Sequence, residues 1–489
     1  MSASINSLCC GIFKPIKKDI AIKGLSLNSK DIKKDDLFIA LPGCKTDGYK
    51  YIQEAIDNGA VAILIEKSAN INKQKFSVPC KSVKNLSKKI SLIASRFYGN
   101  DCRHLNTIAV TGTNGKSSIA YGIKDILNNN NATTGVIGTL GYGVDKLNYS
   151  KHTTPDAISN QAIIANFHKQ NIVNLAIEAS SHGLDQGRIE AVDVDTAIYT
   201  NLSHDHLDYH QNLTNYQKAK QKLFEKPSVK NAVINVNDDF GKHLVHVFED
   251  RLRIISYGLN IPHKGEFLSA ENLSINQHGW DFSLLSSWGD VNLKIKLLGL
   301  FNVENALAML AAFLLVGGDF QKLAQVAVNI KPLTGRMECF GGKDQQPLVV
   351  VDFAHTPDAL AQSLKALRQH MIGTGKLFCV FGCGGNRDQV KRPIMAQVAE
   401  ENADFIIVTD DNPRNEPKEE IISHIIDGFS DKSKVSIIHE RKKAISTAIK
   451  TAQHDDVVLI AGKGHESVQI IGDKEFEFSD QQEVRNILC

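Results

Sequence analysis

The stretch Ile108–Ser118, Ile-Ala-Val-Thr-Gly-Thr-Asn-Gly-Lys-Ser-Ser, restricts the possible folds of this chain more than any other part of the sequence. An apolar β-branched run, Thr107–Val110, leads into it, and a segment with helical spacing, Ile119–Leu127, follows it. A strand, a glycine-rich loop, Lys-Ser and a helix in this order are typical of a phosphate-binding loop, in which backbone amides face the anion and the hydroxyl holds Mg²⁺. The usual pattern has a glycine five residues before Gly115, where this chain has Val110, and a loop of this shape can also simply turn the chain. Because Lys-Ser stands at the start of the helix, we predict nucleotide binding.

The composition is that of a globular protein with several domains. At 489 residues the chain is long enough for two to four domains. Its formal net charge of +2 gives no overall field that favours nucleic acid or a membrane surface. The longest apolar run, Ala306–Val316, is far below the roughly 20 residues that span a bilayer, and Met1–Phe13 lacks the basic and apolar regions of a signal peptide. Nine cysteines without metal-binding spacing are typical of reduced thiols. We therefore expect a cytoplasmic monomer that binds no nucleic acid and does not insert into a membrane.

Hydrophobic patterning divides the chain into three α/β domains. Residues 1–105 alternate short strands and helices and predict a small N-terminal α/β domain. Residues 106–335 contain the phosphate loop and predict a central, P-loop ATPase-like domain with a mostly parallel sheet. Residues 336–489 alternate buried strands and helices and predict a Rossmann-like α/β domain. The predicted strands are Leu37–Leu41, Val61–Ile65, Val173–Ile177, Thr196–Tyr199, Ala232–Val236, the antiparallel pair Phe282–Trp288 and Val291–Leu298, and Leu348–Asp352, Leu377–Phe381, Phe405–Thr409 and Val457–Ala461.

Polar residues follow two of the central strands directly. Glu178 follows the strand Val173–Ile177, and His204, Asp205 and His206 follow the next strand. Ligands of open α/β sheets bind beyond the carboxyl ends of the strands, and these side chains offer the oxygen and imidazole ligands of a Mg²⁺ site. A single histidine after a strand is more often structural, and Asp205 can simply cap a helix. For these residues both interpretations stay open.

A second polar loop, in the C-terminal third, contains Arg414 directly after Asn-Pro. The proline stiffens the loop, so that the guanidinium of Arg414 is suited to bidentate binding of a carboxylate. A solvated loop arginine is the commoner alternative.

A series of motifs runs in order along the chain: Thr111–Ser117, Glu178–Gly183, Asn201–His206, Gly299–Asn305, Thr334–Glu338, Asp352–Asp358 and Gly462–Glu466. In residues and order they resemble the Mur ligases, the ATP-dependent amide-forming enzymes of peptidoglycan synthesis, over about residues 25–480. The motif Asp411-Asn-Pro-Arg414 looks like that of family members that add meso-diaminopimelate, whereas lysine-adding relatives lack the arginine. The family's loop also replaces the outer glycine, which accounts for Val110.

The resemblance implies a reaction in two steps. The carboxylate of UDP-N-acetylmuramoyl-L-alanyl-D-glutamate attacks the γ-phosphate of ATP, and the amine of diaminopimelate attacks the resulting acyl phosphate, with Mg²⁺ as cofactor and ATP as co-substrate. Three alternatives remain: the same ligase adding L-lysine, a folate polyglutamyl ligase, and, from a different class, a P-loop ATPase switch without amide chemistry.

The resemblance also implies a role for each residue that matches a family motif. The implied catalytic residues are Lys116, Glu178, His206 and Lys220, the last of them carbamylated. The implied Mg²⁺ ligands are Ser117, Glu178, His206 and Lys220. The implied ATP site consists of Gly112, Thr113, Asn114, Gly115, Lys116, Ser117, Ser118, Asn305, Arg336, Asp352 and His355. The implied site for the UDP-linked substrate consists of Leu27, Ser29, Cys44, Lys45, Thr46, Thr153, Thr154, Ser180, Gln186 and Arg188. The implied diaminopimelate site consists of Arg387, Asp411, Asn412, Pro413, Arg414, Gly462 and Glu466.

Overall fold

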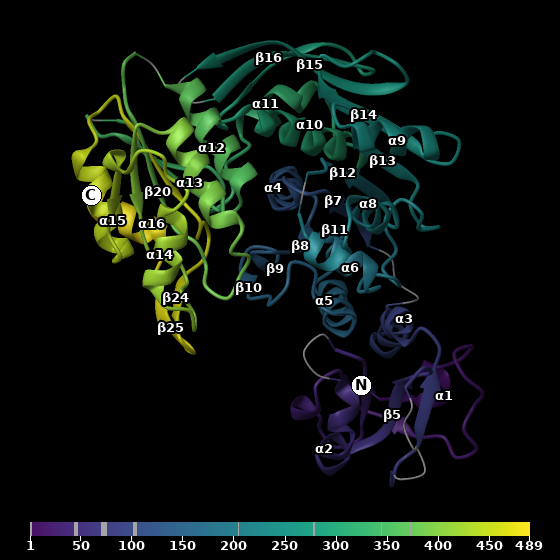
Figure 1. The fold of residues 1–489 in the computed structure, drawn as a ribbon. Coiled ribbons are helices and arrows are strands. Elements are labelled where there is room, and N and C mark those ends of the chain that lie inside the picture. The colour runs from purple at the N-terminus through teal and green to yellow at the C-terminus, as the bar shows by residue number, and fades with distance from the viewer. Residues whose placement is uncertain are drawn as a thin grey trace. The chain divides into compact units, whose positions relative to one another are not determined.

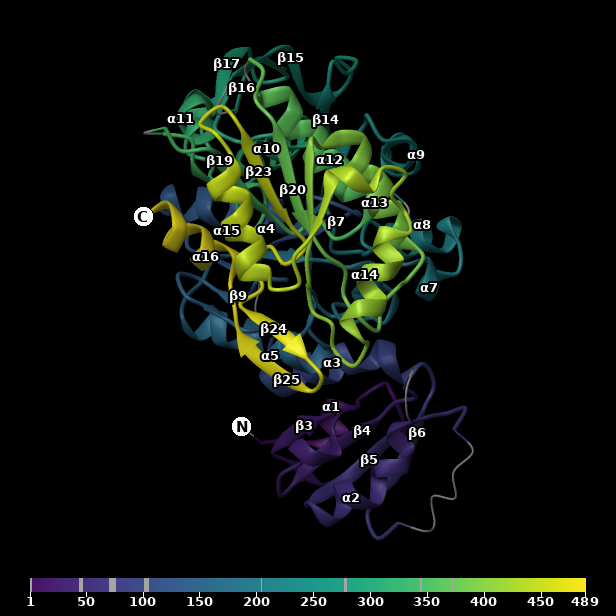
Figure 2. The same ribbon diagram turned by 60° about the vertical axis from the view of Figure 1, so that its left-hand side comes forward.

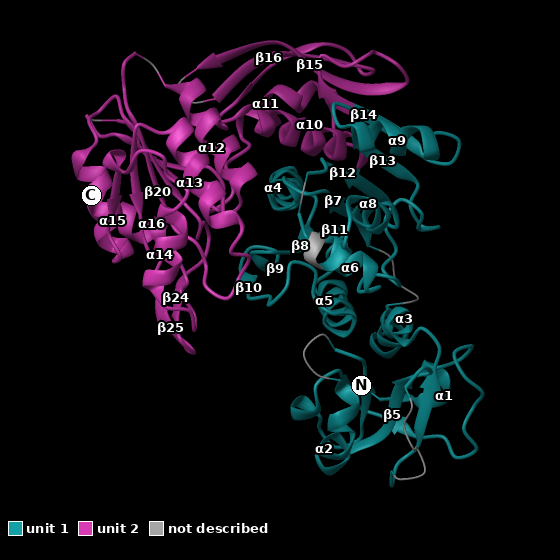
Figure 3. Ribbon diagram, in the orientation of Figure 1, with its two compact units in different colours: residues 1–256 teal, residues 257–489 magenta. Residues whose placement is uncertain are grey.

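The computed structural model describes residues 2–43, 47–69, 76–100, 105–203, 205–276, 279–343, 345–371 and 373–489. The chain separates into two compact units, Met1–Ser256 and Tyr257–Cys489, which Figure 3 shows in teal and magenta. Strand β14 (Arg253–Leu259) contains the boundary between them. No helix within the described ranges is long and apolar enough to cross a membrane.

The first unit begins with a four-stranded parallel sheet in the order β3-β4-β5-β6. Its strands are β3 (Gly24–Ser26), β4 (Asp36–Ala40), β5 (Ala60–Glu66) and β6 (Cys80–Val83). Every residue of β4 is buried, because α2 (Ile52–Asp57) packs on one face of the sheet and α3 (Leu86–Tyr98) on the other. The predicted strands Leu37–Leu41 and Val61–Ile65 are confirmed as β4 and β5, whereas the short, less apolar β3 and β6 were not predicted from the sequence. Short β1 (Ala3–Ser4) and β2 (Ala21–Ile22), with α1 (Ile5–Leu8), precede the sheet.

The second sheet of this unit is mostly parallel and contains the phosphate loop. Within this unit its strands run in the order β10-β9-β8-β11-β7-β12-β13 (Figure 1). The pairs β8–β11, β11–β7, β7–β12 and β12–β13 are parallel, whereas β9 is antiparallel to both β8 and β10. The strands are β7 (Asn106–Thr111), β8 (Thr134–Gly138), β9 (Gly141–Gly143), β10 (Leu147–Asn148), β11 (Asn174–Glu178), β12 (Thr196–Tyr199) and β13 (Asn231–Asn235). The helices are α4 (Lys116–Asn129), α5 (Ala157–Lys169), α6 (Ser181–Asp185), α7 (Leu207–His210), α8 (Leu213–Gln221) and α9 (Asp239–Phe248). This order brings the carboxyl ends of β8, β11, β7 and β12 side by side.

The second unit begins with three antiparallel strands and two helices. β16 (Gly279–Ser286) pairs with β15 (Glu266–Asn276) and with β17 (Val291–Ile295), so the antiparallel pair predicted from the sequence is confirmed. Helices α10 (Leu300–Leu315) and α11 (Leu323–Val328) follow.

The remainder of the second unit is a six-stranded sheet in the order β18-β19-β23-β20-β21-β22. All pairs are parallel except the edge pair of β18 and β19. Its strands are β18 (Glu338–Gly341), β19 (Leu348–Asp352), β20 (Leu377–Phe381), β21 (Phe405–Val408), β22 (Val435–Ile437) and β23 (Val457–Ala461). The helices are α12 (Pro357–His370), α13 (Lys391–Asn402), α14 (Lys418–Ile426), α15 (Arg441–Thr451) and α16 (Asp480–Leu488).

These helices cover both faces of the six-stranded sheet. One buried core joins the sheet to α12, α13 and α14, and a second joins its other face to α15 and α16 (Figure 2). The strands alternate their apolar side chains between the two cores, which explains their continuous apolar runs. The Rossmann-like α/β arrangement predicted from the sequence, with helices on both faces of a mostly parallel sheet, is therefore confirmed. A separate exposed hairpin, β24 (Val468–Ile471) with β25 (Lys474–Glu477), was not predicted.

Candidate functional site

The glycines of the phosphate loop are required by its geometry. Gly112 has φ 150°, and a Cβ atom there would lie 1.8 Å from the hydroxyl oxygen of Thr200, so no other residue fits between the loop and the end of β12. Gly115 has φ 86° and caps α4. The loop is also fixed from the side, because Asn114 donates its N–H to Asn201 Oδ1 at 3.0 Å and accepts the Thr200 hydroxyl at 2.6 Å. The loop is thus held open at the N-terminus of α4, where helix amides attract phosphate.

Two lysines meet at one carbonyl of this loop. Lys116 Nζ donates to Gly112 O at 3.0 Å and to Thr113 O at 2.6 Å, and Lys220 Nζ donates to the same Gly112 O at 2.6 Å. Lys220 is 1% exposed, and its ammonium lies 4.1 Å from the ring centre of Tyr216. Burial, and then the neighbouring charge of Lys116, hold the pKa of Lys220 well below its ordinary value. The site therefore favours a neutral amine at Lys220.

Glu178, the last residue of β11, is completely buried next to the start of α4. Its Oε2 accepts the hydroxyls of Ser117 at 2.9 Å and Thr139 at 3.1 Å, and its Oε1 accepts the backbone N–H of Thr139 at 2.7 Å. Gly138 makes room for this carboxylate, since a Cβ atom there would lie 2.2 Å from Oε1. A carboxylate beside a hydroxyl at a phosphate loop is a hard oxygen donor set, so Ser117 and Glu178 fit a Mg²⁺ ion.

His206 is more exposed than Glu178. Its ring is 4.8 Å from that of His182 and 6.3 Å from that of Tyr216, and its Nε2 lies 3.4 Å from Asp205 Oδ2. Tyr216 connects His206 to the loop, because the same side chain contacts Lys220 and its hydroxyl lies 3.2 Å from the hydroxyl of Thr113. Within the described residues, no three His, Cys, Asp or Glu side chains are close enough to hold a metal ion by themselves. The structure brings Ser117 and Glu178 together, and His204 lies outside the described residues.

The residues predicted to bind the muramoyl peptide form one hydrogen-bonded network with the loop site. Arg188 donates to the backbone oxygen of Thr154 at 2.7 Å and, twice, to the side-chain oxygen of Gln186. Thr154 donates its hydroxyl to the Glu178 backbone oxygen at 2.6 Å and bonds Ser180 at 3.0 Å. The acceptors of the Arg188 guanidinium are thus neutral oxygens, and burial lowers its pKa from the ordinary value.

Thr139 joins this network to Glu178 and was missed by the sequence analysis. Its hydroxyl lies 3.0 Å from that of Thr153 and 3.1 Å from Glu178 Oε2. The strand that leads to it, β8, was not predicted because Gly135 and Gly138 interrupt its apolar run. In the sequence, Thr139 can be recognised as a polar residue directly after a short β-branched segment, like the polar residues that follow the other predicted strands.

The N-terminal part of the predicted substrate site is only partly described. Ser29 is 4% exposed and donates its hydroxyl to Glu54 Oε2 at 2.7 Å, while Leu27 packs against the core under α3. The predicted residues Cys44, Lys45 and Thr46 lie outside the described residues.

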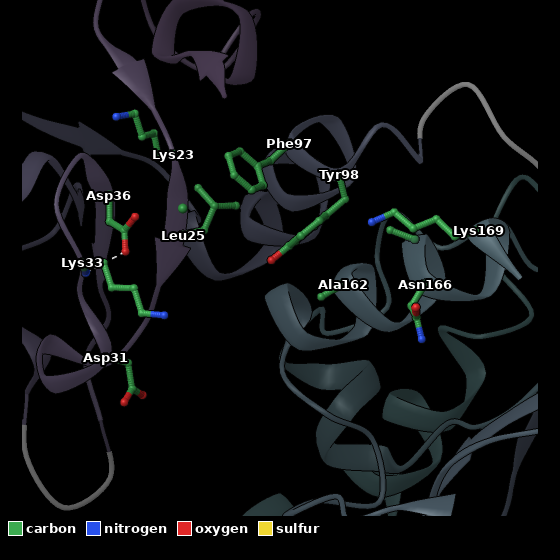
Figure 4. Close-up of a pocket in the computed structure, with 12 residues that line it drawn as sticks. Lys23, Leu25, Asp31, Lys33, Asp36, Phe97, Tyr98, Ala162, Asn166 and Lys169 are labelled. Atoms are coloured by element: carbon green, nitrogen blue, oxygen red, sulfur yellow. Dashed lines mark hydrogen bonds between the residues drawn. The ribbon is translucent and has the colours of Figure 1, made fainter. Parts of the chain in front are cut away.

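A cavity of about 460 Å³ in the first unit is separate from these residues (Figure 4). Its lining combines lysine and aspartate side chains with two aromatic rings from the end of α3 and part of α5: Lys23, Gly24, Leu25, Asp31, Lys33, Asp36, Phe97, Tyr98, Ala162, Ala165, Asn166 and Lys169. No site residue predicted from the sequence and described in the structure contributes to it.

In the second unit, two residues of the predicted ATP site, Arg336 and His355, lie against one aromatic ring. The guanidinium of Arg336 lies 4.4 Å from the centre of the Phe353 ring, and the His355 ring lies 4.6 Å from it. Asp352 accepts the Met337 N–H at 2.7 Å through its second carboxylate oxygen, which fixes the position of that backbone. Asn305 lies on α10 and bonds Asn302 at 2.9 Å instead.

The residues predicted to bind diaminopimelate also lie together. Asn412 donates to Glu466 Oε2 at 2.7 Å, and Gly462, with φ 114°, lies where a Cβ atom would be 2.8 Å from Asp411 Oδ2. Arg414 is half-buried and has φ 52°. Its Nη1 donates to backbone oxygens at 3.0 and 3.4 Å, while no described group accepts from its Nε or Nη2. The buried Pro413 precedes it.

The exposed Arg387 lies close enough to Arg414 to repel it electrostatically. Burial, followed by this charge, lowers the pKa of Arg414. Two guanidinium groups next to each other, one with an unused hydrogen-bonding edge, are suited to an anionic group.

Lys463 is a second residue that the sequence analysis missed. Its side chain is completely buried, and its ammonium donates to Asn412 Oδ1 at 3.1 Å, Glu466 Oε2 at 3.0 Å and Val468 O at 2.7 Å. In the sequence, Lys463 can be recognised as a lysine between two glycines directly after a buried strand.

Comparison with known proteins connects these sites to one family. Three family models match the chain: the Mur ligase family, catalytic domain over residues 21–98, the Mur ligase middle domain over 110–313, and the Mur ligase, glutamate ligase domain over 335–464. A UDP-N-acetylmuramoyl-L-alanyl-D-glutamate–2,6-diaminopimelate ligase of Coxiella burnetii is 41% identical over 97% of each chain. The Pseudomonas aeruginosa protein of the same name is 41% identical over 100% of this chain and 99% of its own.

A solved structure of a ligase with that name covers 100% of this chain and 99% of its own, with 35% identity and a TM-score of 0.71. These matches confirm the predicted three-domain α/β fold class. The boundaries at residues 105 and 335 and the roles of the individual site residues stay predictions.

Proposed function

The chain belongs to the Mur ligase family, and we propose that it is an ATP-dependent amide ligase that adds meso-diaminopimelate to UDP-N-acetylmuramoyl-L-alanyl-D-glutamate in peptidoglycan synthesis. Relatives with this activity in their names match nearly the whole chain at 41% identity. One observation in this chain carries the choice of amino acid, namely the half-buried Arg414 with an unused edge beside Arg387. Diaminopimelate has one more carboxylate than lysine, and a guanidinium edge binds a carboxylate through two parallel hydrogen bonds.

The first unit supplies the groups for phosphoryl transfer. The peptide carboxylate attacks the γ-phosphate of ATP, forming an acyl phosphate and releasing ADP. Transfer of this kind needs positioning and charge stabilisation rather than a protein nucleophile. The loop amides at the start of α4 bind the phosphates, and Lys116, whose ammonium now lies on Gly112 O and Thr113 O, neutralises phosphate oxygens.

Ser117 and Glu178 are the residues that we propose to hold Mg²⁺, together with His206 and Lys220. The ion, when bound, supplies positive charge to the phosphate oxygens as they accumulate negative charge. The hydroxyl and carboxylate oxygens of Ser117 and Glu178, 2.9 Å apart, support this assignment.

Lys220 is suited to carry a carbamate. Its neutral amine forms an N–C bond with CO₂ and loses one N–H proton, which converts the amine into a carbamate anion, a carboxylate-like ligand. Complete burial and the charge of Lys116 both favour the neutral amine that this reaction needs.

The amine of the second substrate then attacks the acyl carbon, passes through a tetrahedral intermediate and expels phosphate. Arg414 and Arg387 bind the distal carboxylate of diaminopimelate, while Asn412, held by Glu466, is placed to bind its polar groups. We retain the cytoplasmic location and the monomeric state as predictions.

Release of ADP and phosphate with purified protein tests the proposal. With ATP, Mg²⁺ and the UDP-linked dipeptide present, release should require meso-diaminopimelate, and L-lysine should support it at least tenfold less well. Equal or better turnover with lysine would transfer the assignment to the lysine-adding reaction. ATP hydrolysis that does not depend on the UDP-linked dipeptide would instead identify an ATPase switch.

A further inference from the structure

The loop that contains Arg414 is held by the hairpin β24–β25. Arg414 donates its N–H to Ile470 O at 3.0 Å, and its own carbonyl accepts the N–H of Gly472 at 2.8 Å, so that the two segments pair like short strands. The Gln469 side chain donates to Asp411 O at 2.8 Å. These bonds hold Arg414 at φ 52°, a left-handed conformation that residues other than glycine rarely adopt.

Lys463 joins this hairpin to the loop from inside the protein. One ammonium group binds the first residue of the hairpin through Val468 O, the loop through Asn412 Oδ1, and its own segment through Glu466 Oε2. Asn412 Oδ1 also accepts the N–H of Ile470, which makes the amide a bridge between loop and hairpin. Because the side chain of Lys463 is completely buried, water cannot replace these bonds if the ammonium is removed.

We propose that Lys463 is a positioning residue for amino-acid selection, because its ammonium fixes the loop 411–414 against the β24–β25 hairpin and thereby sets the orientation of the Arg414 guanidinium. This inference rests on the proposed function of the loop as the diaminopimelate site. Part of the selectivity for the amino acid then depends on a residue outside the motif Asp411–Arg414, because Lys463 acts without contacting the amino acid.

The geometry favours a positioning role over a direct one. All three donor positions of the Lys463 ammonium have protein acceptors, at 2.7, 3.0 and 3.1 Å. An ammonium has three N–H donors, so none remains for a substrate. Arg414, by contrast, keeps its Nε and Nη2 unused by described groups.

The variant Lys463→Met of the full-length enzyme tests this role, since methionine fills a similar volume without the charge. We expect the KM for meso-diaminopimelate to rise about 10-fold or more, while the KM values for ATP and for the UDP-linked dipeptide stay within twofold of wild type. The ratio of kcat/KM for diaminopimelate to that for lysine should fall. An unchanged KM for diaminopimelate, or an equal rise in all three KM values, would overturn the proposal.

Two further variants separate positioning from general loss of stability. Ile449→Ala removes a buried side chain from α15, in the core on the α15–α16 face of the sheet, and should lower the melting temperature without changing the KM for diaminopimelate. Gln469→Ala removes only the hairpin bond to Asp411 O and, even if Lys463→Met does not fold, should raise the same KM two- to fivefold. A normal KM in Gln469→Ala together with a raised KM in Ile449→Ala would overturn the positioning role.

The wild-type enzyme keeps this test distinct from that of the proposed function. Failure of wild type to use diaminopimelate rejects the proposed function. The positioning role is then decided by the KM of whichever amino acid the wild type does use, which Lys463→Met should raise and Ile449→Ala should not.

Discussion

The two charged sites of this protein differ in how deeply their ionisable groups are buried. In the first unit Glu178 is 0% and Lys220 1% exposed, and the Glu178 carboxylate accepts hydrogen bonds from Ser117 and Thr139. In the second unit Arg387 is exposed and Arg414 half-buried, on loops beyond the strand ends. The buried charge of that second site, Lys463, donates to Asn412, two residues before Arg414 in the same loop.

This difference in burial suggests that the first site carries out the reaction and that the second site selects the amino acid. Charges at buried positions are little screened by water and interact strongly with charge that develops on the substrates, so groups like Glu178 and Lys220 are suited to stabilise a transition state. Charges on an accessible loop bind and release a soluble amino acid without large desolvation, which suits Arg387 and Arg414 to recognition. Changes in the first unit should therefore lower kcat, whereas changes in the second should raise one KM.

The largest effect should come from Lys220→Ala in the first unit. Loss of one group that stabilises charge in the transition state costs about 10²–10³-fold in kcat, and we expect a decrease of this size in phosphate release. Lys218→Ala, on the exposed side of the same helix α8, is the matched control and should retain wild-type activity.

A short-chain carboxylic acid added to Lys220→Ala should restore part of this activity, because it replaces the carboxylate of a carbamate. Full activity of the variant, or a dead variant that no acid rescues, would reject the carbamate at Lys220.

The next largest effect should come from Arg414→Ala in the second unit. Losing one partner of a buried, hydrogen-bonded charge pair costs about 2–5 kcal/mol, which corresponds to a rise of roughly 30-fold or more in the KM for diaminopimelate. The kcat at saturation should change little. Arg368→Ala, which removes a surface guanidinium paired with Asp404 in the same unit, serves as control. If kinetics with diaminopimelate are unchanged in Arg414→Ala, the contrast between the two sites is wrong.

Much of the fold followed from the sequence because buried parallel strands are continuous apolar runs. The ranges Leu348–Asp352, Leu377–Phe381 and Val457–Ala461 coincide with β19, β20 and β23. Strand β8 and the hairpin β24–β25 were missed, since glycines interrupt the one and half-exposed or exposed residues compose the other. Hydrophobic patterning identifies strands whose side chains are buried. The hairpin β24–β25 has few buried side chains, and the glycines of β8 have no side chains to contribute to the pattern.

Site residues could be predicted from the sequence when they belong to a polar motif directly after a strand. Residues that act by holding another site residue in place were harder to predict. Glu178 was predicted, but Thr139, which donates two hydrogen bonds to it, comes from a strand that the sequence did not reveal. Lys463 was part of a recognised motif, yet its partners Asn412 and Val468 are brought to it only by the tertiary fold.

A smaller effect is expected for Thr139→Val, which removes one hydroxyl from the first site. The backbone N–H of Thr139 keeps its 2.7 Å bond to Glu178, so the carboxylate loses the hydroxyl bond of 3.1 Å and keeps those from Ser117 and from this N–H. Residues that orient a metal ligand typically affect activity about 10- to 100-fold, and we expect a kcat lower by that factor with a higher Mg²⁺ requirement. Thr134→Val on the same strand, whose hydroxyl bonds Ala132 O, should leave both unchanged. Wild-type Mg²⁺ dependence in Thr139→Val would argue against Glu178 as part of the ion site.

The smallest effect on turnover should come from Glu416→Gln, which changes a carboxylate that holds the loop of Arg387. Glu416 accepts Arg392, which is completely buried, at 2.6 and 2.9 Å, and it accepts the N–H of Asn386 next to Arg387. These bonds, first of all that from Arg392, lower the pKa of Glu416 from 4.5 to about 2. We expect a stability loss of about 1.5–3 kcal/mol at neutral pH, typical for hydrogen bonds to a charged group, and a change of only a few-fold in the KM for diaminopimelate.

The pH dependence of this stability loss has a defined sign. Because the folded-state pKa is depressed, the contribution of Glu416 is fully present above pH 4.5 and is lost as the pH falls through about 2. Both tryptophans, Trp280 and Trp288, lie in the second unit, and the Trp280 ring is 5.5 Å from that of His370 on α12, so their fluorescence during urea unfolding responds to the unfolding of this unit. The difference between wild type and Glu416→Gln should be constant from pH 6 to 8 and shrink below pH 4.5. A difference that grows on acidification would mean that the ionised carboxylate of Glu416 does not stabilise the loop of Arg387.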